Sequence, residues 1–409
     1  MKKVVVAGLA IALVAGVVMS AWFVDGMAVR YLTAQRRVPG RGFFGEEIPQ
    51  DGPVPGTAFL GFSRPSTDPP GMRIVRPFES GREIGLEPGD VVTSVDGMSF
   101  ASMRDLMDHL VKTYQAGDVV TVTAVSDGDA PRDLSLKLRA LIRTPADLEL
   151  AYEDVEIRSE SGNLLRGWFI PPPQSSDGRM VVFVHGLYSS RYQALEHGGK
   201  FWHYRGYGLL TMDLSGHGES EGKYVRYTLD ERKDVASMVR WARKQEGIDP
   251  DKVVVFGTSN GAAAAIYAAA DGLDLPALAL DAPYADLWDA AGVMLKERGG
   301  HPWLRYPLSV AIRFRAGIDL ESVRPVDVIT EIRAPVLFVH GDADRRIPLE
   351  HSERMHQARL DAHLPSQLWV LPGGEHGFDN YPPEGIFWNR ILDFFDRALG
   401  GAPAGWEIS

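Results

Sequence analysis

The chain has 409 residues, of which 45% are hydrophobic, so it is long enough for two or three domains with sizeable cores. Its net charge is −11, and no stretch is dense in Lys and Arg, which argues against a nucleic-acid-binding surface. The absence of cysteine excludes disulfides and thiolate metal sites, and the histidines do not fall at the spacing of zinc ligands.

The first predicted element is an uncharged apolar helix from Val4 to Val24. It would be about 30 Å long, enough to cross the hydrocarbon core of a membrane. A cleaved signal peptide is the alternative, because Val18-Met19-Ser20 offers a cleavage site. We predict a transmembrane signal-anchor over residues 1–25 and a linker over residues 26–56. In both cases we expect the rest of the chain on the extracytoplasmic (periplasmic) side.

A β-rich block follows over residues 57–141. It contains the motif G-L-x-P-G-D-x-V-x-x-V-D-G from Gly85 to Gly97. The pattern predicts a helix over Ser102–Lys112 and strands near Phe59–Phe62, Met72–Val75, Val119–Val125 and Leu134–Leu138. This block resembles the PDZ domains attached to bacterial periplasmic proteases.

The PDZ resemblance implies a site for the C-terminus of a peptide. Backbone N–H groups near Gly61 can form a nest for a carboxylate, and the groove beside the Ser102 helix can accept an extended peptide as an added strand. The residues that the resemblance places at this site are Phe59, Leu60, Gly61 and Phe62. The alternative is that the domain only spaces the following domain from the membrane.

From residue 148 to 400, strand and helix patterns alternate, which predicts a mostly parallel sheet covered by helices on both faces. Thr228-Leu229-Asp230-Glu231 predicts a capping box at the start of one helix. Eight strands are expected, near Val155, Leu165–Ile170, Val181–Val184, Leu209–Met212, Val253–Phe256, Ala277–Leu280, Val336–Val339 and Gln367–Leu371.

The fifth of these strands leads into Gly257-Thr258-Ser259-Asn260-Gly261 and then an alanine-rich helix. A strand-to-helix turn this sharp strains its central residue and exposes that residue's side chain at the carboxyl edge of the sheet. Ser259 is therefore the predicted nucleophile.

A serine nucleophile needs a histidine base and a carboxylate to orient it. His376 lies in a Gly-Gly-Glu-His-Gly loop after the last strand, and Asp344 and Asp342 follow the strand before it. Asp344 is the predicted acid, and Asp342 is the competing candidate, which we expect to brace the loop. Three further histidines, His185, His217 and His340, are interpreted as structural.

Over roughly 250 residues, this part of the chain resembles α/β-hydrolases of the serine aminopeptidase and esterase-like group. The resemblance is carried by Phe183-Val184-His185-Gly186-Leu187, by the loop Met212-Asp213-Leu214-Ser215-Gly216-His217-Gly218-Glu219-Ser220, and by Gly317 to Ile329 before the acid strand. It implies an eight-stranded α/β-hydrolase core, favours Asp344 over Asp342, and places two oxyanion-binding N–H groups at Leu187 and Asn260.

Residues 281–333 hold several large apolar side chains, which would form either a lid over an acyl pocket or the packing of an ordinary helix. The sequence as a whole predicts a membrane-anchored serine hydrolase that cleaves esters or related acyl bonds without a metal or organic cofactor. A serine peptidase is the nearest alternative. A PDZ scaffold with an inactive hydrolase domain is the alternative from another class.

Overall fold

The computed structural model describes residues 47–400, except residues 59, 78, 101, 127–128, 298–299 and 379. The described chain divides into two compact units, one formed by residues 47–152 with 195–200 and one by residues 153–194 with 201–400. The predicted anchor over residues 1–25 and most of the predicted linker lie outside the described residues. Within the described part, no helix combines the length and the apolar character needed to cross a membrane.

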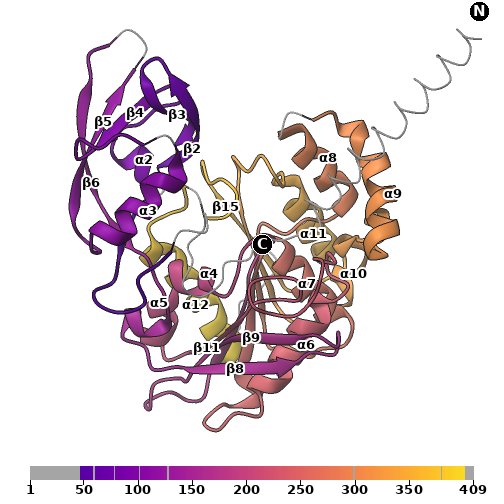
Figure 1. The fold of residues 1–409 in the computed structure, drawn as a ribbon. Coiled ribbons are helices and arrows are strands. Elements are labelled where there is room, and N and C mark those ends of the chain that lie inside the picture. Colours follow the sequence, from indigo (N-terminus) through magenta and orange to yellow (C-terminus); the bar gives the residue numbers. More distant parts are fainter. Residues whose placement is uncertain are drawn as a thin grey trace, which may run out of the picture. The chain divides into compact units, whose positions relative to one another are not determined.

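The first unit is built on a five-stranded antiparallel sheet with the order β2-β3-β4-β5-β6. Its strands are β2 Gly61–Thr67, β3 Pro70–Pro77, β4 Val91–Val95, β5 Val119–Val125 and β6 Arg132–Lys137. Two helices, α2 Glu79–Glu83 and α3 Met103–Thr113, accompany the sheet, and β1 Gly56–Thr57 pairs with β7 Arg139–Ala140. The sheet therefore begins with β2 at its edge, next to β3 alone (Figure 1).

The predicted helix of this unit is α3, which begins one residue after Ser102. The Ser102 side chain accepts the N–H of Asp105 at 3.2 Å, which satisfies one of the unpaired donors at the helix start. Leu106 and Leu110, spaced four residues apart, are buried in the core of the unit. The short helix α2 was not predicted, because five residues are too few to show a helical period.

The second unit contains the predicted eight-stranded sheet, in the order β15-β14-β13-β12-β10-β11-β9-β8. The six strands from β15 to β11 in this row are parallel. At the other edge, β9 is antiparallel to β11, and β8 is antiparallel to β9. Their bounds are β8 Glu153–Arg158, β9 Leu164–Ile170, β10 Met180–Val184, β11 Gly208–Met212, β12 Val253–Thr258, β13 Leu278–Asp281, β14 Val336–Gly341 and β15 Ser366–Leu371. The fold is that of an α/β-hydrolase, with a mixed sheet, and the predicted core architecture is confirmed.

Helices cover both faces of this sheet because its central strands are apolar on both sides (Figure 1). Val255 packs in one core with α6 and α7, while the ring of Phe256 lies 5.2 Å from that of Trp388 on α12. From residue 153 on, the α-helices of the described chain are α4 Tyr192–Glu196, α5 Gly199–Tyr204, α6 Glu231–Ala242, α7 Asn260–Ala270, α8 Leu287–Glu297, α9 Arg305–Ala316, α10 Pro325–Val328, α11 Glu350–Asp361 and α12 Glu384–Leu399.

The predicted capping box at Thr228 is wrong. Helix α6 begins at Glu231, two residues later than a Thr228 cap requires, and Thr228 has a φ of 81°. The Glu231 side chain is fully buried, and its Oε1 accepts the N–H of Arg226 at 2.8 Å. Its Oε2 has no hydrogen-bond partner among the described residues. The Glu231 side chain is therefore used for a buried contact with the preceding loop and does not form the capping box with Thr228.

Burial raises the pKa of Glu231 to about 7, and nearby Asp234 adds to the effect. Because the folded-state pKa exceeds the unfolded one, the ionised form destabilises the fold, and stability is lost as the pH rises from about 4.5 to about 7. Glu231→Gln keeps an acceptor but cannot ionise. We expect it to raise the free energy of unfolding by about 3 kcal/mol more at pH 8 than at pH 4.5. Urea unfolding at both pH values measures this, and an equal change at the two values would contradict it. Glu353→Gln, exposed on α11, is the control.

Candidate active site

The predicted nucleophile lies at a strained turn between β12 and α7. Ser259 has a φ of 53° and a ψ of −120°, a conformation that a residue with a side chain rarely adopts. The turn is held by the Ser259 N–H, which donates to the carbonyl oxygen of Asp281 at 2.8 Å. Glycine is needed at Gly261, because a Cβ there would lie 2.4 Å from the carbonyl oxygens of both Val184 and His185.

The structure brings the three predicted triad side chains together. Nε2 of His376 lies 3.0 Å from Oγ of Ser259, and Nδ1 of His376 lies 2.7 Å from Oδ2 of Asp344. With Nδ1 donating its proton to Asp344, Nε2 is left as an acceptor for the serine hydroxyl. The residues come from the ends of β12, β14 and β15, three strands on one side of the sheet order. This is the arrangement in which a histidine can take a proton from a serine.

The Asp344 carboxylate is held as an anion. Its Oδ1 accepts the N–H groups of Arg346 at 2.8 Å and Ile347 at 2.9 Å. Burial by itself would raise the pKa of Asp344, but the charge of His376 and the hydrogen bonds from His340 and His376 outweigh burial and hold that pKa well below its usual range. A permanent carboxylate is what the triad arrangement requires of its acid.

The competing carboxylate, Asp342, contacts the backbone of the histidine loop and not the imidazole. Its Oδ1 accepts the N–H of Gly373 at 2.6 Å, so it joins the turn after β14 to the loop that carries His376. Asp342 is exposed, whereas the side chain of Asp344 is fully buried. The geometry thus separates an acid that contacts the imidazole from one that braces its loop.

The three histidines interpreted as structural are all buried in the interior of the unit. Nε2 of His185 accepts the N–H of Leu214 at 3.0 Å, so its other nitrogen, Nδ1, donates to the carbonyl oxygen of Gly186. Burial lowers the pKa of His185 to about 4, which keeps it neutral. His340 contacts Ser352 and the carbonyl of Ile347, and His217 contacts the carbonyl of Ser215. Each one therefore holds a loop in place at the sheet edge.

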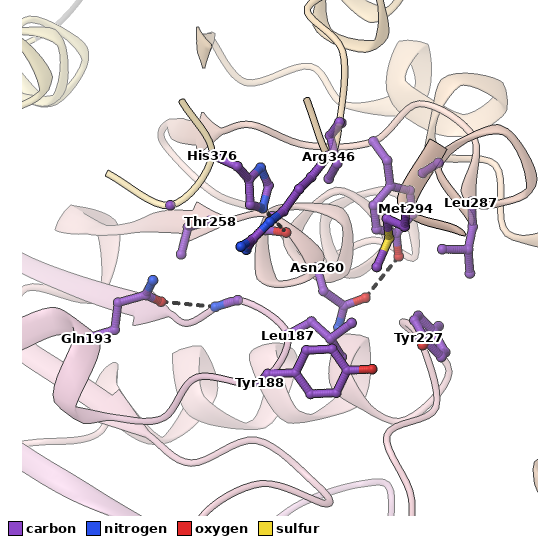
Figure 2. A pocket seen from close by; sticks show the side chains of 16 residues that line it. Leu187, Tyr188, Gln193, Tyr227, Thr258, Asn260, Leu287, Met294, Arg346 and His376 are labelled. Carbon is purple, nitrogen blue, oxygen red and sulfur yellow. Dashed lines mark hydrogen bonds between the residues drawn. The ribbon is translucent and has the colours of Figure 1, made fainter. Parts of the chain in front are cut away.

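The two predicted oxyanion donors lie at the pocket beside Ser259. Among the described residues, neither the Leu187 N–H nor the Asn260 N–H has a hydrogen-bond acceptor in the chain. The turn before Leu187 is fixed by Gln193, whose Oε1 accepts the Gly186 N–H at 3.0 Å. Figure 2 shows that contact, and also the hydrogen bond from Tyr284 to the Asn260 side chain at 2.9 Å. Two unpaired N–H groups beside a nucleophile are suited to a developing negative charge.

Sequence reasoning missed a second buried carboxylate near the triad, Asp281 at the end of β13. It accepts hydrogen bonds from Tyr381 at 2.8 Å and Thr258 at 3.1 Å, and burial raises its pKa to about 6. Tyr381 follows the loop of His376, so Asp281 ties that loop to the nucleophile strand. The only signal in the sequence was a polar residue directly after an apolar strand.

The pocket beside Ser259 has a volume of about 150 Å³. Leu287, Ala290 and Met294 of α8 contribute an apolar wall. In Figure 2, Leu287, Met294 and Tyr227 gather on one side of Asn260, and His376 lies on the other. A dry cavity of about this volume can hold a benzene ring, so the pocket fits a short acyl chain or a small side chain. Residues 281–333 thus combine the two alternatives. Helix α8 lines the pocket, while Leu308 of α9 packs in the core with α8 as in an ordinary helix.

Of the predicted PDZ site, only part can be placed. Leu60 has no exposed surface and belongs to the core of the first unit, so its side chain does not line a groove. Gly61 begins the edge strand β2, and Phe59 lies outside the described residues. Within the part of the chain that the structure describes, no three His, Asp or Glu side chains gather as ligands for a metal ion.

Comparisons with known proteins find a matching family, similar relatives and similar solved structures. A model of the prolyl oligopeptidase family matches residues 195–402. The α/β hydrolase domain-containing protein WAV2 of Arabidopsis thaliana is 26% identical over 62% of this chain and 82% of its own length. The uncharacterized protein Rv2307c of Mycobacterium tuberculosis is 28% identical over 61% of this chain and 79% of its own. The esterase Pf2001 of Pyrococcus furiosus has a similar structure, with a TM-score of 0.51 and 26% identity over 62% of this chain and 94% of its own.

Proposed function

Because the chain belongs to the prolyl oligopeptidase family and is a serine hydrolase, we propose that it cleaves esters or related acyl bonds with Ser259, His376 and Asp344. The observation that carries this proposal is the 3.0 Å contact between Nε2 of His376 and Oγ of Ser259. The similarity to the Pf2001 esterase supports ester substrates.

The proposed reaction runs in two steps. Nε2 of His376 takes the proton of Ser259 as Oγ attacks the carbonyl carbon, and the N–H groups of Leu187 and Asn260 hold the oxyanion. His376 then returns the proton to the leaving alcohol as the bond to it breaks. A water molecule then attacks the acyl-enzyme and gives up a proton to His376, which returns it to Oγ of Ser259 as the acyl bond breaks and the acid is released. Asp344 stabilises the imidazolium in both steps.

Peptide or aminoacyl amide bonds are the second candidate, because the family is named for oligopeptidases. The pocket volume of about 150 Å³ admits a small amino-acid side chain as well as a short acyl chain. We place esters first, since the chemistry of the triad needs less activation for an ester than for an amide.

A substrate panel tests this order. We expect kcat/KM to be highest for p-nitrophenyl esters with acyl chains up to about six carbons, because longer chains exceed a pocket of benzene size. The panel compares acetate to dodecanoate esters with aminoacyl p-nitroanilides, on the full chain. Esters of dodecanoate hydrolysed as fast as those of butyrate, or amides preferred over all esters, would contradict the proposal.

For the remaining segments, we propose membrane anchoring by the apolar segment of residues 4–24 and an extracytoplasmic location, on the strength of the sequence alone. We also propose that the first unit is PDZ-like and binds the C-terminus of a partner protein along β2. The edge position of β2 supports this, because an edge strand has backbone groups free to pair with an added strand. The spacer role remains the alternative.

A further inference from the structure

Large apolar side chains are exposed along one side of α9. Tyr306, Val310 and Phe314 follow each other at intervals of four residues, which places them on one face of the helix. Trp303 lies just before them, in the short helix Pro302–Leu304. The exposed fractions are 57% for Trp303, 57% for Tyr306, 69% for Val310 and 93% for Phe314. We call these four residues the α9 stripe.

The α9 stripe is not the core-facing side of the helix. That role belongs to Leu308 and Ile312, each 1% exposed, which pack in one core with Leu287 and Leu295 of α8. The ring of Trp288 on α8 lies 5.0 Å from that of Tyr306 and 4.7 Å from the Arg305 guanidinium, which fixes the two helices against each other. Figure 1 shows α9 outside α8 within this unit. The orientation of the helix therefore keeps the stripe turned outward.

The charge on α9 is of one sign. The helix carries Arg305, Arg313 and Arg315 and no acidic residue, in a chain whose net charge is −11. Arg313 makes an ion pair at 3.4 Å with Asp319, but both side chains are well exposed, so the pair does little to neutralise the surface. Cations beside exposed Trp, Tyr and Phe are the composition of helices that lie in the boundary region of a membrane.

We propose that the α9 stripe binds the surface of an anionic lipid bilayer, with its aromatic side chains between the headgroups and its arginines on the lipid phosphates. A second copy of the chain fits less well, because two such faces would bring the Arg313 side chains of both copies together. The inference does not depend on the triad. It concerns the attachment of the hydrolase unit to a membrane surface. Helix α8 packs against α9 and also lines the pocket, so the stripe lies one helix away from the pocket wall.

The absence of cysteine allows a test with a single attached probe. Phe314→Cys in the full chain, labelled with the fluorophore NBD, is mixed with phosphatidylcholine vesicles containing 0 or about 30% phosphatidylserine. We expect a blue shift and a several-fold rise in emission only with the anionic vesicles, because NBD brightens when it leaves water. Ile386→Cys, at a 60% exposed apolar position on α12, is the matched control and should not respond.

Three results would overturn the proposal: no response at position 314, an equal response at 386, or a blue shift without vesicles that grows with protein concentration, which would indicate a second copy.

Replacing both Arg313 and Arg315 with Gln in the labelled Phe314→Cys chain should weaken the response to anionic vesicles about 10- to 30-fold in lipid concentration, from about 1 kcal/mol per arginine. An unchanged lipid requirement would contradict the role of charge. Hydrolysis of a soluble ester, measured on the same variants, should stay unchanged, so a failure here is distinct from a failure of the proposed function.

Discussion

Replacing Ser259 with alanine is expected to lower kcat for a soluble p-nitrophenyl ester on the order of 10⁵-fold. The hydroxyl is the only group at the strained turn that lies within hydrogen-bond distance of His376, among the described residues. Without it, attack must come from water, and only the oxyanion donors and the pocket still contribute. Single-turnover and steady-state assays on the purified chain measure this loss.

The proposed mechanism also predicts that substitutions of Ser259 and His376 are not additive. His376→Ala should cost about as much as Ser259→Ala, and the double variant should be no slower than either single one, because the two groups act as a unit. A fluorophosphonate probe should label the native chain and neither Ser259→Ala nor the double variant. Absence of labelling in the native chain would favour the scaffold alternative with an inactive hydrolase domain. Full labelling of Ser259→Ala, or losses that multiply in the double variant, would contradict the proposed roles of Ser259 and His376. Thermal unfolding of each variant checks that the fold is kept.

The second large effect is expected at the acid. Asp344→Asn should lower kcat about 10⁴-fold, because an amide NH₂ at this position favours the imidazole tautomer with its proton on Nε2, where the serine needs an acceptor. The buried position of Asp344 and its contact of 2.7 Å with Nδ1 leave His376 little freedom to escape this change. The loss should appear in kcat more than in KM, since the carboxylate does not line the pocket.

Asp342→Asn is the matched control for this prediction. The two aspartates are two residues apart, but Asp342 accepts the N–H of Gly373 and lies on the exposed side of the loop. An asparagine oxygen can accept the same hydrogen bond, so we expect less than a tenfold change in kcat. Comparable losses in Asp342→Asn and Asp344→Asn would show that the carboxylates act on loop structure alone, against the proposed role of Asp344.

Much of the hydrolase unit could be predicted because its signals are local. Runs of β-branched residues such as Val253 to Val255 favour strands, and the glycines on either side of Ser259 are needed for a turn whose strain is set within five residues. The order of serine, acid and histidine along the chain then limited the candidates to a few polar loops. The eight strands and the mostly parallel sheet followed from this alternation.

The tertiary structure decided the questions that depend on contacts between distant segments. Asp342 and Asp344 lie in the same polar loop after β14, so the sequence pattern alone does not separate them. The pairing of β14 with β15 determines which of them contacts His376. The capping box predicted at Thr228 does not form, because Glu231 is buried among residues of other elements.

By itself, the sequence determined the strand-helix alternation, the strained serine turn and the few polar loops that supply its partners, because each of these depends on neighbouring residues. Only the tertiary structure decided that α8 walls the pocket, that Asp281 and Tyr381 tie the histidine loop to the nucleophile strand, and that one side of α9 is left exposed. The physical reason is that burial and hydrogen-bond partners are properties of residues far apart along the chain, which no local pattern encodes.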